Sequence, residues 1–189
     1  MADGTLKVGT ITTSSGSGTI TLGQSGETIS VPSGATFSAT AGTMSGQNYP
    51  AFEAFLSVSQ SIPNDTVTKC NIDTEVFDTD SCYDNSVNYR FTPNVAGKYF
   101  IYGQVYVENL SSDTLQIRIY KNGSILTIGA INTGSLTASN MLNVTTMDTA
   151  NGSSDYYELY CYQDSGSSTN LNGNASNKRS FFGAYRIGA

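Results

Sequence analysis

The spacing of hydrophobic residues divides this chain into two parts. In the first 45 residues single apolar residues recur within a Gly/Ser/Thr-rich background, in the phrases Thr10-Ile11-Thr12, Thr19-Ile20-Thr21, Thr28-Ile29-Ser30 and Thr36-Phe37-Ser38. The phrases start 9, 9 and 8 residues apart, and glycines lie between them. Such a fixed register is typical of a repeat array.

Each repeat is too small to fold alone. One unit offers an apolar pair such as Ile20 with Leu22, whose burial returns about 1.5 to 3 kcal/mol per side chain. Ordering the backbone costs about 1 to 2 kcal/mol per residue. We therefore expect residues 1–45 to form a thin β-repeat stalk wound from several identical chains, with a core of Ile11, Ile20, Leu22, Ile29, Val31 and Phe37. The alternative, a flexible linker, would not need apolar residues at fixed spacing.

From Tyr49 onward the pattern changes to short runs rich in Val, Ile, Tyr and Phe. Turn signals separate the runs, among them Pro93-Asn94, Asn122-Gly123 and Asn151-Gly152. No segment sustains a 3.6-residue period, so residues 49–189 are predicted to form an all-β, antiparallel sandwich. The expected strands span 51–57, 68–77, 89–91, 97–107, 115–121, 124–128, 142–146, 156–163 and 180–187.

Three of these strands are apolar on both faces. In 98–107 one face carries Tyr99, Ile101, Val105 and Val107 while the other is aromatic, and 156–162 and 180–185 repeat the theme. A sheet that is apolar on both faces is covered by a second layer or by another subunit, the alternative being aromatic rings left in solvent. We predict a subunit interface made by Phe100, Tyr102, Tyr106, Tyr156, Tyr160, Tyr162 and Phe182.

Charge and composition narrow the partners. The chain has 15 acidic and 9 basic residues, a net charge of -6, and no basic cluster beyond Lys178-Arg179, which argues against nucleic acid. No apolar run approaches the roughly 20 residues of a membrane helix, and the first residues lack a secretion signal. We therefore expect synthesis in a cytoplasm without membrane insertion. Cys70, Cys82 and Cys161 show no CxxC spacing and are expected to be buried free thiols.

Catalytic chemistry has little support. The chain has no histidine, which removes the usual general base and every Ser-His or Cys-His pair. Glycan cleavage needs only two carboxylates, so a polysaccharide depolymerase is kept as a remote alternative to a protein without enzyme activity or cofactor. Asp78, Asp80 and Asp84 are the one candidate metal cluster. Calcium prefers several oxygen ligands, but Cys82 breaks the EF-hand pattern, and a solvated turn is the favoured interpretation.

Several stretches are similar to a known family. Residues 49–54, 76–84, 91–100, 121–123, 155–160 and 180–187 together resemble the complement C1q and tumour-necrosis-factor-like jelly roll, in family order. The resemblance implies a ten-stranded jelly-roll head over 49–189 that forms a tight homotrimer with an aromatic inner sheet at the three-fold axis. This sequence departs from the family at Gly103, where an aromatic is common, and at Ser153-Ser154, which replaces a glycine. Collagen-like Gly-x-y repeats are absent.

The N-terminal part has a second resemblance. Residues 4–11 with the Thr/Ser/Gly repeat are similar to the opening of structural proteins of tailed, especially aquatic, bacteriophages. This implies a virion structural protein, assembled in the host cytoplasm, whose N-terminal segment docks on capsid or tail proteins. Head decoration and tail-fibre receptor binding both fit, and a bacterial surface adhesin is the alternative. A further hypothesis is that the Ser/Gly/Asn/Thr-rich loop 164–177 contacts host-surface glycans.

Overall fold

The computed structural model describes residues 11, 18–36, 48–110, 112–136 and 138–189, with side chains described except at 112, 113 and 131–136. The chain divides into two compact units, Met1–Met44 and Ser45–Ala189. We describe each unit by itself.

The N-terminal unit carries two turns that repeat the sequence register. Glu27 N–H donates to Gln24 O, and eight residues later Ala35 N–H donates to Pro32 O, both at 3.0 Å. Residues 18–36 contain no strand in this single chain, and the expected core residues Ile11, Ile20, Leu22, Ile29 and Val31 are all exposed. Phe37 lies outside the described residues. The multi-chain stalk therefore stays a prediction.

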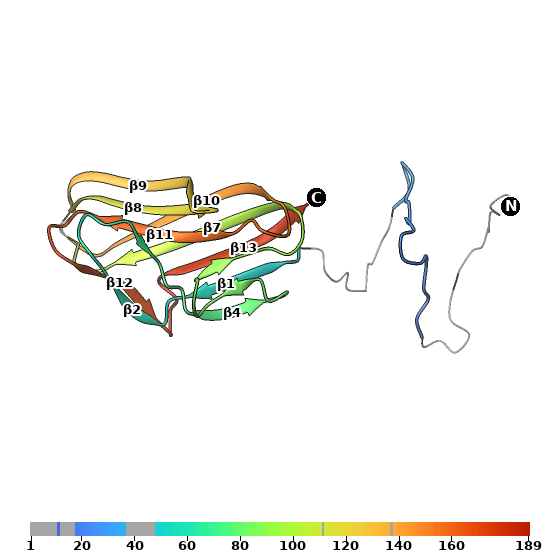
Figure 1. Cartoon of the computed structure of the whole chain (residues 1–189), viewed down its shortest axis with the longest axis horizontal. Coiled ribbons are helices and arrows are strands. Elements are labelled where there is room, and N and C mark those ends of the chain that lie inside the picture. Colours follow the sequence, from blue (N-terminus) through green and yellow to red (C-terminus); the bar gives the residue numbers. More distant parts are fainter. Residues whose placement is uncertain (1–10, 12–17, 37–47, 111, 137) are drawn as a thin grey trace. The chain divides into compact units, whose positions relative to one another are not determined.

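The second unit consists of antiparallel strands that run along the length of the head (Figure 1). Their bounds are β1 Ala51–Phe55, β2 Val58–Ile62, β3 Thr68–Lys69, β4 Thr74–Asp78, β5 Tyr83–Asp84, β6 Arg90–Phe91, β7 Gly97–Val107, β8 Ser112–Lys121, β9 Ser124–Leu136, β10 Asn140–Ala150, β11 Tyr157–Gln163, β12 Thr169–Asn174 and β13 Phe181–Gly188.

These strands form two sheets. The first sheet has the order β2-β12-β7-β13-β1-β4, and β10 pairs with β7 along its whole length. The second sheet has the order β5-β6-β11-β8-β9, and β3 pairs with β11. Apart from the consecutive pairs β5–β6 and β8–β9, neighbours in both sheets are not consecutive in sequence, so crossovers connect the sheets, as in a jelly roll. The all-β, antiparallel sandwich predicted for residues 49–189 is confirmed.

The core lies between the sheets and follows the predicted alternation. On β7 the side chains of Tyr99, Ile101, Val105 and Val107 are fully buried, and the side chains that alternate with them, of Phe100, Tyr102, Gln104 and Tyr106, are half-buried. Across the core Phe52 stacks on Tyr83 and Phe91, with ring centroids 4.4 and 4.7 Å apart. Aromatic stacking adds about 0.5 to 1.5 kcal/mol per pair beyond area burial. Cys70, Cys82 and Cys161 are buried free thiols, as predicted.

Several predicted strand bounds needed correction. The range 68–77 is two strands, because Ile72 N–H bonds back to Cys70 O at 2.9 Å and the chain turns there. The segment 164–177 is not one loop. It contains β12, which pairs with β2 and β7 and buries Leu171 and Asn172. Its backbone is therefore engaged in the first sheet rather than free to bind a ligand.

Candidate functional site

An aromatic cluster occupies the outer face of the first sheet. It consists of Phe100 and Tyr102 on β7 with Phe181 and Tyr185 on β13, the residues that alternate with the core positions of these strands. Ring centroids are 5.9 Å apart for Phe100–Tyr102, 5.5 Å for Phe100–Tyr185 and 6.1 Å for Tyr102–Phe181. All four side chains are half-buried in the single chain. The cluster therefore presents a contiguous apolar surface.

A glycine positions the central ring of this cluster. Gly183 lies between Tyr102 and Glu53 in the strand register, and a Cβ atom there would lie 2.4 Å from the Tyr102 ring. The ring can thus lie flat across β13. The Tyr102 hydroxyl donates to Glu53 Oε2 at 3.0 Å. Burial and the Glu53 carboxylate raise the pKa of Tyr102 well above its usual range.

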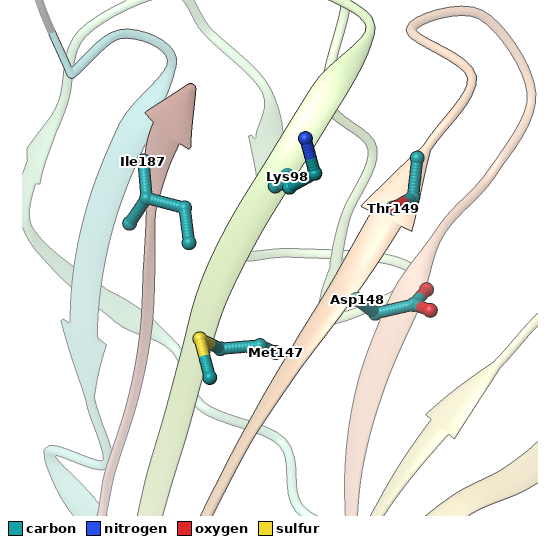
Figure 2. Close-up of a pocket in the computed structure, with 5 residues that line it drawn as sticks. All are labelled: Lys98, Met147, Asp148, Thr149 and Ile187. Atoms are coloured by element: carbon teal, nitrogen blue, oxygen red, sulfur yellow. The ribbon is translucent and has the colours of Figure 1, made fainter. Parts of the chain in front are cut away.

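Apolar residues of β10 extend the cluster. Met147 and Met141 are opposite Phe100 and Tyr106 in the register, and their side chains are 69% and 47% exposed. Figure 2 shows Met147 lying over β7. Together with Ile187, Lys98, Asp148 and Thr149 it lines an open, mainly apolar hollow of about 280 Å³. Exposed methionines are adaptable contact residues, so this margin also suits a protein partner.

Cations lie only at the margin of this face. The Arg179 guanidinium lies over Tyr106, 4.8 Å from the ring centroid, and Lys178 Nζ lies 5.8 Å from the centroid of Phe55. Among the residues that the structure describes, no Lys or Arg lies over a ring of the aromatic cluster. In the described part of the chain the four rings contact one another and have no cation partner.

The outer face of the second sheet is built differently. Its rings form what we call the tyrosine–cation ladder: Arg90 over Tyr156 at 4.6 Å, Lys69 over Tyr160 at 5.7 Å and Arg118 over Tyr162 at 5.6 Å, with Tyr120 packed 4.3 Å from Tyr160. Cation–π contacts of this kind contribute about 0.5 to 1 kcal/mol each at exposed sites. The tyrosines here have partners within their own chain.

The predicted subunit interface is therefore split. Phe100, Tyr102 and Tyr106 lie on the outer face of the first sheet, whereas Tyr156, Tyr160 and Tyr162 belong to the outer face of the second. These two faces point away from each other, because the core lies between the sheets. A subunit contact made by the outer face of the first sheet therefore does not include Tyr156, Tyr160 and Tyr162.

Phe182 was assigned to the wrong face. It is 0% exposed and packs edge-on against Phe52 in the core, with the ring centroids 5.2 Å apart. Phe181 and Tyr185 take the outer positions that the prediction missed. The signal was Gly183, which shares their alternation and leaves room for a ring on the outer face. The pair Phe181-Phe182 alone did not show which ring faces inward.

The acidic loop satisfies its carboxylates with backbone amides. Asp84 accepts hydrogen bonds from Val87 N at 2.9 Å, Asn88 N at 3.1 Å and Asn88 Nδ2 at 2.6 Å. These bonds, led by that from Val87, hold the pKa of Asp84 well below its usual range. Asp78 Oδ2 accepts from Tyr83 N at 2.8 Å. In the described part of the chain no three acidic, cysteine or histidine side chains gather to hold a metal, so Asp78, Asp80 and Asp84 do not form such a site.

An ion network closes one end of the sandwich. Lys121 Nζ lies 2.7 Å from Asp148 Oδ2 and 3.4 Å from Asp155 Oδ2, and the Tyr157 hydroxyl donates to Asp148 at 2.7 Å. The hydrogen bond from Asn122 and the other donors lower the pKa of Asp155. Desolvation by burial raises the pKa of Asp148. The hydrogen bonds from Lys121 and Tyr157 outweigh this effect, so the pKa of Asp148 is lowered overall. The network joins β8, β10 and β11 and is structural.

Comparison with known proteins identifies the fold. No protein-family model and no curated protein sequence matches the chain. Among solved structures, Eiger TNF from S. frugiperda matches with a TM-score of 0.56 and 12% identity, over 72% of this chain and 91% of that chain. Murine APRIL matches with a TM-score of 0.54 and 13% identity, over 72% of this chain and 98% of that chain. The globular domain of zebrafish complement 1qA matches with a TM-score of 0.50 and 13% identity, over 73% of this chain and 97% of that chain.

The head is a C1q/TNF-like jelly roll. The resemblance found in residues 49–189 is thereby confirmed at the level of fold. At 12 to 13% identity the similarity extends to the fold alone. Within the described residues no helix is long and apolar enough to cross a membrane.

Proposed function

We propose that this chain is a non-enzymatic, homotrimeric virion structural protein of a tailed phage. Its residues 1–45 dock on capsid or tail proteins, and its jelly-roll head is displayed on the particle surface after assembly in the host cytoplasm. One observation carries the oligomeric part of this proposal. Among the described residues the half-buried rings of the first sheet have no cation partner, whereas the tyrosines of the second sheet stack with Arg90, Lys69 and Arg118.

The contrast between the two faces supports an interface on the first sheet. Burying an aromatic side chain returns about 1.5 to 3 kcal/mol relative to exposure, and four adjoining half-buried rings with two exposed methionines offer that gain to another protein surface. Aromatic residues and methionine are enriched in interface cores. A second and third copy can each supply the same surface about a three-fold axis. The second sheet then faces outward.

The N-terminal unit supports the virion part of the proposal. Ile20, Leu22, Ile29 and Val31 are exposed in the single chain, and their turns recur in register. Three chains held together at the heads would bring three copies of these residues close enough to bury one another. The similarity of residues 4–11 to phage structural proteins supports the docking role.

The experiment separates assembly from location. In analytical ultracentrifugation the wild-type chain should sediment at three times 20.0 kDa, and Tyr102→Glu should dissociate it, because a charge would be desolvated at the interface. The matched control is Tyr156→Glu, which places the same charge beside Arg90 on the second sheet and should leave the trimer intact. A stable wild-type monomer would refute the trimer.

Location is tested on purified particles. Antibody labelling or mass spectrometry should find the chain on virions, and deletion of residues 1–45 should abolish incorporation while the head remains folded. Absence of the full-length chain from virions would overturn the phage role without affecting the trimer result. If the truncated chain is incorporated into virions as fully as the full-length chain, the head and not residues 1–45 carries the docking surface.

A further inference from the structure

Two guanidinium groups on the second sheet have no carboxylate partner. Among the described residues neither Arg90 nor Arg118 forms an ion pair. Arg118 Nε and Nη2 both donate to Gln116 Oε1, at 2.9 and 2.5 Å, and Arg90 stacks on the ring of Tyr156. Stacking leaves guanidinium N–H donors accessible at the edge, so Arg90 can offer its Nε–Nη edge and Arg118 its terminal Nη1–Nη2 edge. Each of these edges matches a carboxylate in bidentate geometry.

The acidic groups around the ladder are already engaged. Glu158 pairs with Lys69 at 2.5 Å and accepts from the Tyr160 hydroxyl at 3.3 Å. Asp65 accepts from the Tyr162 hydroxyl at 2.7 Å, and Asp84 is saturated by the amides of its own turn. The face therefore carries mixed charge, with its two unpaired groups both positive.

The ladder is contiguous across four strands. Arg90 on β6 is opposite Glu158 on β11, which is opposite Tyr120 on β8. Two residues further along β11, Tyr160 is opposite Arg118 on β8 and Lys69 on β3. The two arginines are thus separated by tyrosines on a single sheet, within one subunit.

We propose that the tyrosine–cation ladder binds a polysaccharide that carries carboxylated sugars. The carboxylates would pair with Arg90 and Arg118, sugar hydroxyls would bond to tyrosine hydroxyls and Gln116, and the amphipathic rings would pack against the apolar faces of the sugars. The inference rests on the proposal that this face points outward, and it names the ligand class and site. This proposal places the glycan contact on the second sheet instead of on segment 164–177, where the sequence pattern predicted it.

Mixed charge selects this occupant over a nucleic acid. A single strand carries a phosphate charge on every nucleotide, and its affinity depends on several neutralising cations. Here the two unpaired arginines lie among Glu158, Asp65 and Asp84, and the chain carries a net charge of -6, so the ladder lacks the run of cations that a phosphate backbone needs. A carboxylated sugar instead offers a planar carboxylate to a single guanidinium edge, and its hydroxyls and apolar face suit the tyrosines.

The test measures binding of the full-length chain to immobilised polysaccharides by interferometry. The probes are polygalacturonate, alginate and polysialic acid, with methyl-esterified polygalacturonate as the ligand control and oligothymidylate as the nucleic-acid control. At least one carboxylated probe should bind. Esterification should weaken binding to polygalacturonate about tenfold or more if that is the bound probe, because it removes the partner of each arginine.

The variant is Arg90→Gln/Arg118→Gln, which should lose about tenfold or more in affinity. Its matched control, Lys7→Gln/Arg186→Gln, removes the same charge outside the second sheet and outside the aromatic cluster, and should stay within about twofold. The inference is overturned if none of the three probes binds, if the ester binds equally, if oligothymidylate binds more tightly, or if the arginine variant is undiminished. Sedimentation of the same samples reports the trimer separately, so either proposal can fail alone.

Discussion

The side chain of Leu159 fills the space in which a Cβ atom at Gly103 would lie. Such an atom would sit 2.6 Å from Leu159 Cδ1, well inside contact distance. Gly103 is on β7 of the first sheet and Leu159 is on β11 of the second, so the pair fixes how closely the sheets approach at mid-core. This explains why a glycine occupies this core-facing position of β7. The space beside Gly103 is filled by the Leu159 side chain, which comes from the second sheet.

Adding a methyl group at this position should destabilise the head. We expect Gly103→Ala to lower the free energy of unfolding by about 1 to 3 kcal/mol, the usual range for overpacking a core. Leu159→Ala alone should cost about 2 to 5 kcal/mol through the cavity it leaves. In the double variant the two changes compensate, so its loss in urea unfolding should be smaller than the sum. Strict additivity would contradict the close packing.

A side chain at Gly183 should weaken the trimer while leaving the core intact. In Gly183→Ala the new methyl displaces the Tyr102 ring and breaks its hydrogen bond to Glu53. The dissociation constant of the trimer should rise at least tenfold by sedimentation, with little change in far-UV circular dichroism. Gly188→Ala is the control, because a Cβ there meets nothing within 4 Å. Equal behaviour of the two variants would argue against the interface assignment.

Acid should open the end of the sandwich that Lys121 closes. The folded pKa values of Asp148 and Asp155 are lowered, so their contribution is present above the unfolded value of about 4 and is lost as pH falls through the folded values. The loss of stability between pH 7 and pH 3 should therefore be smaller in Asp148→Asn than in wild type, by urea unfolding at each pH. Asp80→Asn is the charge-matched control. An unchanged pH dependence in Asp148→Asn would exclude this network as its source.

The sequence predicted best where local alternation and core packing agree. The bounds of β7 were predicted as 97–107 because four large apolar residues alternate along it and all face the core. β12 was missed because Leu171 is its single large apolar residue. The Nδ2 of its buried polar residue Asn172 donates to Glu108, 64 residues away, while Asn172 Oδ1 has no hydrogen-bond partner among the described residues. A partner so distant leaves no mark on the local pattern.

The candidate site was predicted in composition but not in arrangement. The sequence revealed the second aromatic rows, since period-two alternation is visible in β7 and β11. It did not reveal which row has its own partners, because Lys69 and Arg90 approach β11 from β3 and β6 through the fold. That difference supports the proposal that the first sheet, and not the second, is the face covered by another subunit. It becomes visible only when the strand order is known.

The division of aromatic residues between the two sheets separates two kinds of constraint on this protein. A change in the aromatic cluster is multiplied by three in the proposed assembly, since every copy must fit the other two. A change in the tyrosine–cation ladder affects one subunit at a time and leaves its neighbours untouched. In the proposed assembly, substitutions that alter ligand preference can therefore accumulate one at a time on the second sheet, while the first sheet keeps the geometry of the trimer constant.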